Sequence, residues 1–321
     1  MSSRPTFRDK QKNNKSGEAS GNTSIFGKED YCNIAVISTT AGATPIVRLG
    51  KNQLAELNDR LTDRDFEILT TLKHAKYLIA DQIRRLFITD ASSKMAGMRA
   101  ASRNMFKLKE LGLVKTFERR IGGKRAGSAS YVWALTEGGQ RLLALHNNEG
   151  YTRRGGRLIE PSYEHIRHTL TIAECYVLLT ELARKNPSVL LKEVQWEPES
   201  WRPYSVSSKG RILKPDLAFV TYVNGYEDRW FVEVDMSTQS MPAIVTKSER
   251  YHHYLKTGIE QRAHHNVFPI PIWIVSDEHR KDLMIRTLKK TYKKAPHMFA
   301  VIIIDELEDL VLNGADPNQL Y

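Results

Sequence analysis

The sequence has few cysteines and no long apolar run. Two cysteines, Cys32 and Cys175, occur among 321 residues, which excludes a disulfide framework and a zinc site made of four cysteines. The longest apolar run, MFAVIIID at 298–305, is far too short to span a bilayer. The first 24 residues are polar and lack the apolar stretch of a signal peptide. The sequence therefore predicts a cytoplasmic protein that does not enter a membrane.

Acidic residues are fewer than basic ones, with 37 Asp and Glu against 48 Lys and Arg and a net charge of +11. The imbalance is concentrated in one segment, because residues 94–125 contain ten Lys or Arg and two Glu. A basic segment this dense is typical of a surface that binds a phosphate backbone. We therefore expect double-stranded DNA as a partner.

The chain is long enough for two domains, each with its own core. Its 41% hydrophobic and 26% charged residues are typical of a soluble globular protein. Composition and pattern divide the chain into a disordered basic tail (1–25), an irregular segment (26–59), a first domain (60–147), a linker (148–162), a second domain (163–305) and an acidic tail (306–321).

The first domain begins with three helix signals. Thr62 is the expected N-cap of the first helix, and Asp65 completes an approximate capping box. The segment IADQIRRLFI predicts a second, short helix, and a third is expected from Ser92 or Ser93 to the stop at Gly112. Two strand patterns joined by a glycine-rich, basic tip follow, and Thr136 then caps a last helix. Three helices and a hairpin in this order predict a winged helix-turn-helix.

The third helix and the hairpin carry the candidate DNA contacts. Arg99, Arg103 and Lys107 recur every four residues, which places them on one face of the helix. In a winged helix-turn-helix the third helix enters the major groove and the wing touches the backbone. The expected contacts on the hairpin are Arg119, Arg120, Lys124 and Arg125. A solvated basic face, or a surface for a protein partner, is the alternative.

The second domain predicts a sheet covered by helices. A helix over 163–185 precedes three strand patterns, two of them joined by a turn at Asn224-Gly225. A helix ending at Gly258 is followed by the apolar strand PIPIWIVS, a second helix, EHRKDLMIRTLKKTYKK, and the apolar strand MFAVIIID. Apolar strands separated by helices indicate a partly parallel sheet with both faces buried.

Two motifs in this domain, KPDLAFV and FVEVD, stand on successive strands. Hydrolysis of a phosphodiester uses one or two Mg²⁺ ions, which prefer carboxylate oxygens. Asp216 and Glu233 are the candidate metal ligands. The order of elements and these motifs resemble the restriction-endonuclease-like PD-(D/E)xK superfamily over 163–305. That resemblance implies a mixed sheet flanked by helices and a Mg²⁺ site, usually completed by a carboxylate from the preceding helix. Glu174 is the candidate for this third carboxylate, and Glu193 is the alternative.

The lysine that usually follows the glutamate is missing, because Asp235 occupies its place. In some members of the superfamily the lysine has moved to the next helix, where this chain has Lys247, with Tyr251 one turn further on. Lys247 can equally be an ordinary surface lysine. Two further interpretations are that Asp235 makes the site more acidic, or that catalysis has been lost. His165 and His168 are interpreted as packing or capping groups, with a phosphate contact as the alternative for His168.

Taken together, the segments LTDRDFEILTTLKHAKYLIADQIRRLF, ALTEGGQRLL, RHTLTIAECYVLL, KPDLAFV and FVEVDMST resemble the replication-relaxation family of plasmid and mobile-element proteins. The resemblance implies a winged-helix first domain, a nuclease-like second domain and a role on mobile-element DNA. The expected function is DNA binding in replication, transfer or processing, with Mg²⁺-dependent cutting or nicking. The alternative is a non-catalytic replication or transcription factor. A homodimer and protein partners from a mobile-element complex are also expected.

Overall fold

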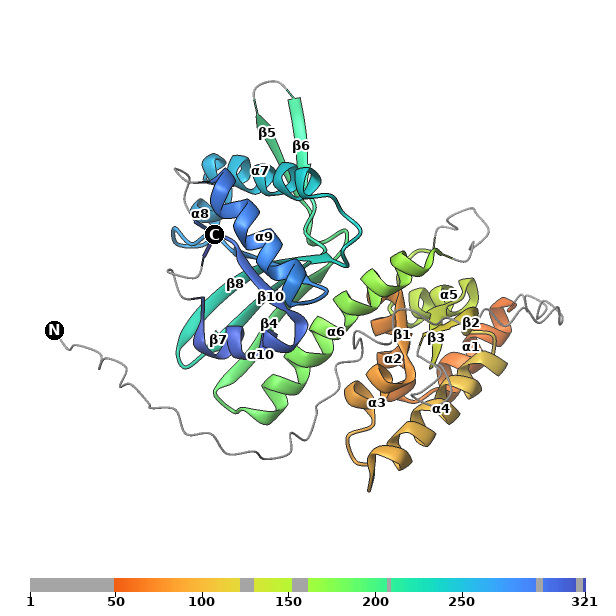
Figure 1. Cartoon of the computed structure of the whole chain (residues 1–321). Helices are drawn as coiled ribbons and strands as arrows, with labels where there is room; N and C mark the ends of the chain where they lie inside the picture. Colours follow the sequence, from red (N-terminus) through yellow and green to blue (C-terminus); the bar gives the residue numbers. More distant parts are fainter. Residues whose placement is uncertain (1–48, 122–129, 152–160, 207–208, 293–296, 316–319) are drawn as a thin grey trace, which may run out of the picture.

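A computed structural model describes residues 49–121, 130–151, 161–206, 209–292, 297–315 and 320–321 (Figure 1). The amino-terminal unit consists of α1 (Lys51–Arg60), α2 (Asp63–Ala75), β1 (Tyr77–Ile79), α3 (Ala80–Phe87), α4 (Lys94–Glu110), β2 (Val114–Ile121), β3 (Ser130–Leu135) and α5 (Glu137–His146). Its three strands form an antiparallel sheet in the order β1-β3-β2.

The helix starts in this unit follow local capping chemistry. The Thr62 hydroxyl accepts from the Asp65 amide, and the Asp65 carboxylate accepts from the Thr62 amide at 3.1 Å. Ser93 and Thr136 cap α4 and α5 in the same way, through side-chain oxygens. The three predicted cap positions are confirmed. Strand β1 is too short to give a pattern in the sequence and was not predicted.

Residues 51–60 differ from the prediction of an irregular segment. They form helix α1, which packs against α5 and buries Leu54 and Leu57. These two leucines, three residues apart, are the only apolar stripe on the helix, so its formation depends on the α5 surface. Residues 26–48 of the predicted segment, and the predicted basic tail, lie outside the described residues.

The carboxy-terminal unit is built around a five-stranded mixed sheet in the order β10-β9-β8-β7-β4. Strands β4, β7 and β8 are antiparallel, whereas β8, β9 and β10 are parallel. Asn224 and Gly225, both with positive φ, form the predicted turn between β7 and β8. The elements are α6 (Tyr163–Lys185), β4 (Val189–Trp196), β5 (Arg202–Val206), β6 (Lys209–Leu213), β7 (Leu217–Val223), β8 (Tyr226–Asp235), α7 (Met241–Thr257), α8 (Ile259–Ala263), β9 (Ile270–Val275), α9 (Glu278–Thr291), β10 (Ala300–Ile303) and α10 (Leu307–Asn313).

Helices cover both faces of this sheet, as predicted. On β8, Val232 and Val234 belong to the core that includes α6, while Phe231 belongs to the core formed with α7 and α9. Side chains alternate along a strand, so Glu233 faces the same side as Phe231. The predicted acidic tail contains α10, which packs on α6 and buries Leu307 and Val311.

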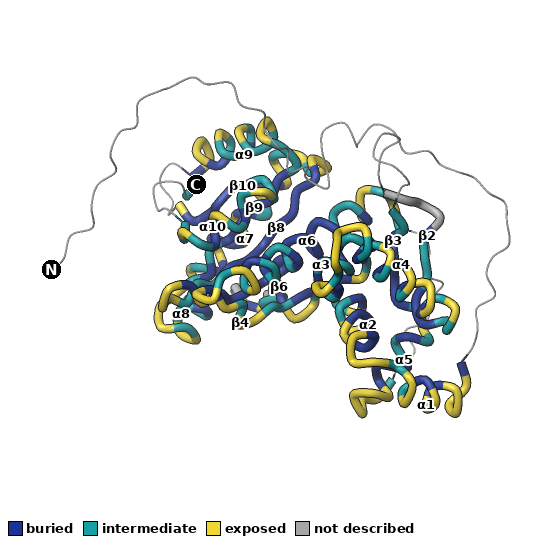
Figure 2. The backbone as a smooth tube through the Cα atoms, turned by 90° about the horizontal axis from the view of Figure 1, so that it is seen from below, coloured by how far each residue is buried: buried dark blue, intermediate teal, exposed yellow. Residues whose placement is uncertain are grey.

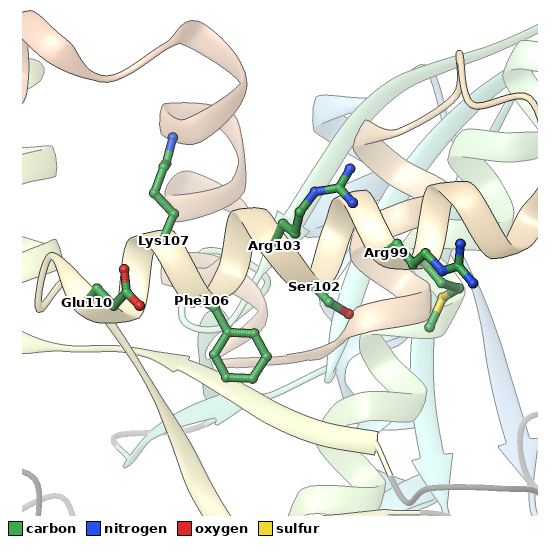
Figure 3. Close-up of a pocket in the computed structure, with 7 residues that line it drawn as sticks. Arg99, Ser102, Arg103, Phe106, Lys107 and Glu110 are labelled. Atoms are coloured by element: carbon green, nitrogen blue, oxygen red, sulfur yellow. The ribbon is translucent and has the colours of Figure 1, made fainter.

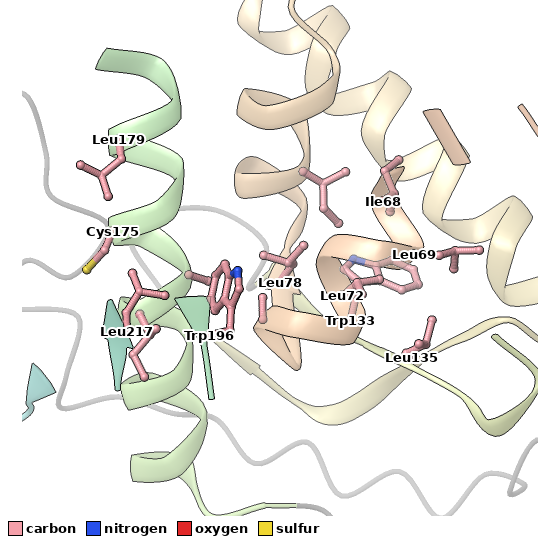
Figure 4. Close-up of a cluster of buried hydrophobic side chains, with 14 of the residues drawn as sticks. Ile68, Leu69, Leu72, Leu78, Trp133, Leu135, Cys175, Leu179, Trp196 and Leu217 are labelled. Carbon is pink, nitrogen blue, oxygen red and sulfur yellow. The ribbon is translucent and has the colours of Figure 1, made fainter. Parts of the chain in front are cut away.

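Helix α6 touches both units. Ile166 and Leu170 pack with Ile79 and Val132 of the three-stranded sheet, and further along α6 faces the five-stranded sheet. One cluster of buried side chains therefore continues from the first unit into the second (Figure 4). Exposed residues gather on outer helices such as α1 and α9, whereas the carboxyl half of β8 is buried (Figure 2). Within the described residues, none of the helices has the length and apolar character needed to span a membrane.

Candidate functional site

Asp216 and Glu233 lie at the same end of the five-stranded sheet. Asp216 directly precedes β7, and Glu233 is near the end of the antiparallel strand β8. The Asp216 amide donates to the carbonyl of Val232 at 2.9 Å, and its carboxylate accepts from the Val234 amide at 2.8 Å. These two backbone bonds fix the Asp216 side chain against the strand that carries Glu233.

The entry to β7 differs from the predicted strand. RILKPDLAFVTYV was expected to be continuous, but Pro215 separates β6 from β7. Proline has no amide hydrogen for a sheet ladder, so the chain breaks there. The Ser200 hydroxyl donates to the carbonyl of Pro215 at 2.7 Å and holds the break in place. The break leaves Asp216 as the first residue to enter the main sheet.

Helix α7 supplies a lysine to this pair of carboxylates. The Lys247 ammonium forms an ion pair with Glu233 Oε2, and the Tyr251 hydroxyl donates to Glu233 Oε1 at 2.6 Å. Lys247 and Tyr251 are one turn apart, so both reach the same carboxylate. Glu233 is fully buried, whereas the Lys247 side chain is 23% exposed. The structure thus brings together Asp216, Glu233 and Lys247.

Burial and charge act against each other in this cluster. Burial raises the pKa of Glu233, and the neighbouring Lys247 only partly offsets this. Burial would also raise the pKa of Asp216, but Lys247 and a hydrogen bond from His168 outweigh it and lower the pKa. Burial would lower the pKa of Lys247, yet Glu233 and Asp216 together raise it. Lys247 therefore remains an ammonium ion.

Two further residues lie beside this cluster: His168, for which the sequence left a phosphate contact as the alternative to packing or capping, and Glu197, which was not predicted. His168 Nε2, on α6, lies 3.2 Å from Asp216 Oδ2. Glu197 follows Trp196, which pairs with Leu217, so Glu197 stands next to Asp216 across the β4–β7 pair. Its Oε2 accepts from the Lys76 ammonium at 2.8 Å. In the sequence, Glu197 is distinguished only by its position directly after a strand pattern. That position points to Asp216 only once the pairing register of β4 and β7 is known.

Glu174 is placed away from Asp216, in contrast to the prediction. Its carboxylate pairs with Arg85 of α3 and accepts from Gln82 Nε2 at 3.0 Å. Glu174 is six residues after His168, which rotates it about 120° around the helix to another face. The alternative, Glu193, is exposed and accepts a hydrogen bond from Gln195. The predicted third carboxylate is therefore part of the contact between the two units.

Asp235 is also committed elsewhere. It is fully buried and points to the same side of β8 as Glu233, but its Oδ2 accepts from Arg280 Nε of α9 at 2.6 Å. Lys247 and Arg280 thus each neutralise one carboxylate of the strand. In the described part of the chain, no three His, Cys, Asp or Glu side chains form a group that could hold a metal ion. Asp216 and Glu233 remain a pair.

The outer face of α4 forms a second candidate site. A groove of ≈ 550 Å³ is lined by Met98, Arg99, Ser102, Arg103, Phe106, Lys107 and Glu110 (Figure 3). Arg99 and Arg103 are exposed, and neither has a carboxylate partner among the described residues. Phe106 is 40% exposed and packs edge-on against Trp133 at 5.3 Å. The groove therefore combines two unpaired cations with an aromatic ring.

Lys107 differs from its two basic neighbours. Its ammonium donates to Asp65 Oδ2 at 2.6 Å, and Asp65 is buried at the start of α2. Lys107 thus ties α4 to α2 within the unit. Of the hairpin residues predicted to contact DNA, Lys124 and Arg125 lie outside the described residues, as do the side chains of Arg119 and Arg120.

The family model described as Replication-relaxation matches residues 69–270. The chain belongs to this family. The matched region includes α4 and all of the Asp216–Glu233–Lys247 cluster, and it excludes α1 and α10. The resemblance predicted from the sequence motifs is confirmed.

Other comparisons add little to the replication-relaxation assignment. No curated protein matches the chain. Among solved structures, the restriction endonuclease FokI is similar at 12% sequence identity, with 80% of this chain and 74% of that chain covered and a TM-score of 0.19. A TM-score this low carries no argument about fold or activity. The functional interpretation of this replication-relaxation protein therefore depends on its own residues.

Proposed function

We propose that this chain binds double-stranded DNA of a plasmid or other mobile element and cuts or nicks it with Mg²⁺ at the cluster of Asp216, Glu233 and Lys247. The observation that carries the proposal is the position of Lys247. Lys247 is on α7, and its ammonium forms an ion pair with Glu233. Asp235, which pairs with Arg280, occupies the strand position where a lysine would be expected, so Lys247 would take the role of that lysine. The cluster thus has the residue types of a PD-(D/E)xK site, drawn from three elements.

DNA binding is supported by the topology of the amino-terminal unit. The order α2-β1-α3-α4-β2-β3, with the sheet order β1-β3-β2, supports the proposal that this unit is a winged helix-turn-helix in which α4 would be the third helix. Such a helix lies in the major groove, where arginine reads guanine edges or contacts phosphates. The unpaired guanidinium groups of Arg99 and Arg103 are available for this contact. Lys107 is not assigned to it, because Asp65 holds its ammonium.

The donor set fits a magnesium ion. Mg²⁺ keeps several waters and is commonly held by one or two carboxylates together with substrate phosphates. Asp216 and Glu233 would be those two carboxylates, and Glu233 is a buried carboxylate that already attracts a cation. Bound there, the metal would supply Lewis-acid polarisation of the phosphate and a more acidic water. We therefore expect two protein ligands and not three.

The other side chains of the cluster position these groups. Tyr251 fixes Glu233 through Oε1, which leaves Oε2 directed at the ammonium of Lys247. His168 holds Asp216 Oδ2, and its side chain is 30% exposed. Lys247 would balance the negative charge that develops on the phosphate. Tyr251, His168 and Lys247 each already contact one of the two carboxylates.

Incubation of supercoiled plasmid with the protein and Mg²⁺ or Mn²⁺ tests the cutting step. The wild type is expected to produce nicked or linear DNA, and Asp216→Ala, Glu233→Ala and Lys247→Met are expected to lose this activity. Glu227→Gln is the matched control, because it removes a carboxylate from the exposed end of the same strand. Intact plasmid with every metal, while DNA is still shifted on a gel, would rule out cutting.

A non-catalytic DNA-binding factor is the second candidate. The observation favouring it is that His168 and Lys247 already satisfy the two carboxylates within the chain. In that case the cluster would stabilise the fold, and plasmid replication would depend on α4 alone. Plasmid replication in cells that carry Glu233→Gln separates the two candidates. Full replication with Glu233→Gln, but none with Arg99→Ala plus Arg103→Ala, would favour the non-catalytic factor.

A further inference from the structure

Strands β5 and β6 form a two-stranded ribbon that is separate from both larger sheets. They pair in an antiparallel register from Arg202 opposite Leu213 to Val206 opposite Lys209. The ribbon projects beyond α7 at the edge of the carboxy-terminal unit (Figure 1). Its second strand ends at Leu213, only three residues before Asp216. The ribbon is therefore anchored directly beside the candidate cutting site.

The base of the ribbon is held firmly. Arg202 pairs with the buried carboxylate of Glu260 at 2.9 Å and lies over the ring of Phe231. Tyr204 and Leu213 are buried in the core that α7 and α9 share. These contacts fix Arg202, Tyr204 and Leu213, and therefore the end of the ribbon that is nearest to Asp216. Conformational entropy lost on binding a ligand would be correspondingly small.

The outer residues of the ribbon carry unopposed positive charge. The segment from Trp201 to Pro215 contains four Lys or Arg and no Asp or Glu. Arg211 and Lys214 are exposed, and neither has a carboxylate partner among the described residues. The Lys214 ammonium lies 4.1 Å from the ring centroid of Trp201, and Ile212 is 46% exposed. Arg211 and Lys214 are thus two cations without a carboxylate partner in the described chain, close to the start of β7.

We propose that the ribbon is a second DNA contact, in which Arg211 and Lys214 bind phosphates next to the one at the cutting site. The inference rests on the proposed function, because it assigns the occupant of the ribbon from the DNA that α4 would bind. Charge complementarity selects DNA, since a polyanion is the partner that an acid-free, basic ribbon attracts. Lys214 is two residues from Asp216, so its Cα lies within about 7.6 Å of the Asp216 Cα. The ribbon would hold the strand in place while α4 sets the position along the duplex.

The test measures binding and does not require cutting. The affinity for a fluorescent duplex of fixed length is measured by anisotropy in EDTA at several salt concentrations, with wild type and Arg211→Ala plus Lys214→Ala. Each phosphate contact contributes about 0.9 to the salt slope, so the loss of two lowers the slope by about 1.8. Between 50 and 200 mM salt, the wild type is then expected to lose about tenfold more affinity than the variant.

Two controls accompany the double variant. Arg286→Ala plus Lys290→Ala removes the same charge from exposed positions on α9, which packs on β9 and β10, toward the opposite edge of the sheet from β7 and β4. This control is expected to keep the wild-type slope. Arg211→Lys plus Lys214→Arg preserves both charges and is expected to bind like the wild type. A melting temperature equal to that of the wild type verifies that each variant is folded.

The outcomes distinguish the ribbon from the proposed function. A slope unchanged in the ribbon variant but reduced in Arg99→Ala plus Arg103→Ala overturns the ribbon contact and leaves DNA binding by α4 in place. A reduced slope in the ribbon variant supports the contact, even where the wild type leaves plasmid intact and the cutting proposal fails. If the salt slope falls equally in the ribbon and α9 variants, the effect comes from net charge alone, and the ribbon contact is overturned.

Discussion

Replacement of Arg85 by methionine tests the contact between the two units. The Arg85 guanidinium pairs with Glu174 and Glu181 of α6, and its side chain is only 12% exposed. Methionine keeps much of the apolar stem and removes the charge. Glu174, which is 6% exposed, would then retain only its bond from Gln82. A buried carboxylate without a cation is the main consequence of the substitution.

The expected loss is large because Glu174 is buried and the Arg85 side chain is only slightly exposed. Removal of one partner from a buried ion pair costs about 3–5 kcal/mol. Glu181 is more exposed than Glu174, at 21%, so most of the loss comes from Glu174. A loss of about 3 kcal/mol lowers the melting temperature by roughly 6–12 °C in a protein of this size class. Calorimetry of the full chain at pH 7.5 measures this shift.

The neighbouring arginine is the matched control. Within the described part of the chain, Arg84 has one acidic partner, Asp81, three residues earlier on the same helix, and such a pair contributes about 0.2–0.5 kcal/mol. Arg84→Met is therefore expected to shift the melting temperature by about 2 °C or less. Equal shifts for the Arg84 and Arg85 variants would refute the assignment of Arg85 to the contact between units.

The same variant has a predicted pH dependence. Burial raises the pKa of Glu174, while Arg85 and Gln82 oppose this effect. Without Arg85 the pKa rises further, so the folded variant takes up a proton at a higher pH than the unfolded chain. The full cost of the substitution is present above the raised pKa and decreases as the pH falls through it. A loss at pH 5 that equals the loss at pH 7.5 would contradict the role of the Glu174 charge.

Three further variants separate structure from function. Glu174→Gln is expected to lower the melting temperature but to leave the rate of plasmid cutting unchanged. A loss of cutting without a change in melting temperature would show that Glu174 belongs to the metal site after all. Burial would raise the pKa of Asp65, but bonds from Lys107 and the Thr62 cap lower it, so Lys107→Met should cost about 1–2 kcal/mol at pH 7 after allowance for the exposure of the lysine. In urea titrations this cost should vanish as the pH falls through the lowered pKa, where Asp65 becomes neutral. Gly139→Ala would place a Cβ 2.3 Å from the carbonyl oxygen of Leu113, and chemical denaturation should detect a loss of about 1–3 kcal/mol.

Features encoded by neighbouring residues could be predicted from the sequence. Thr62, Ser93 and Thr136 each cap a helix through the amide three residues further on, so the sequence alone contains the whole interaction. The turn at Asn224-Gly225 is equally local, because both residues tolerate positive φ. The position of Lys247 near Glu233 could be predicted because α7 directly follows β8.

Features that depend on distant partners could not be predicted. The role of Glu174 is decided by Arg85, which is 89 residues earlier in the chain. Nothing within α6 indicates which face docks on α3, so the carboxylate could not be assigned. Lys107 was read as one of three equivalent cations, and only the packing of α4 on α2 sets it apart. The ribbon was overlooked because Arg202–Val206 is short and contains a proline.

Helix α6 has a consequence for how the chain can be divided or recombined. It presents His168 to the carboxylate cluster, Glu174 and Glu181 to α3, and Ile166 and Leu170 to the three-stranded sheet. A fragment that begins at residue 163 would expose an apolar stripe and leave a buried acid unpaired. A fragment that ends at residue 147 would lose α6, which covers its three-stranded sheet. The two units are thus not interchangeable modules, and a chimera would have to inherit α6 together with the surface of α3 that it matches.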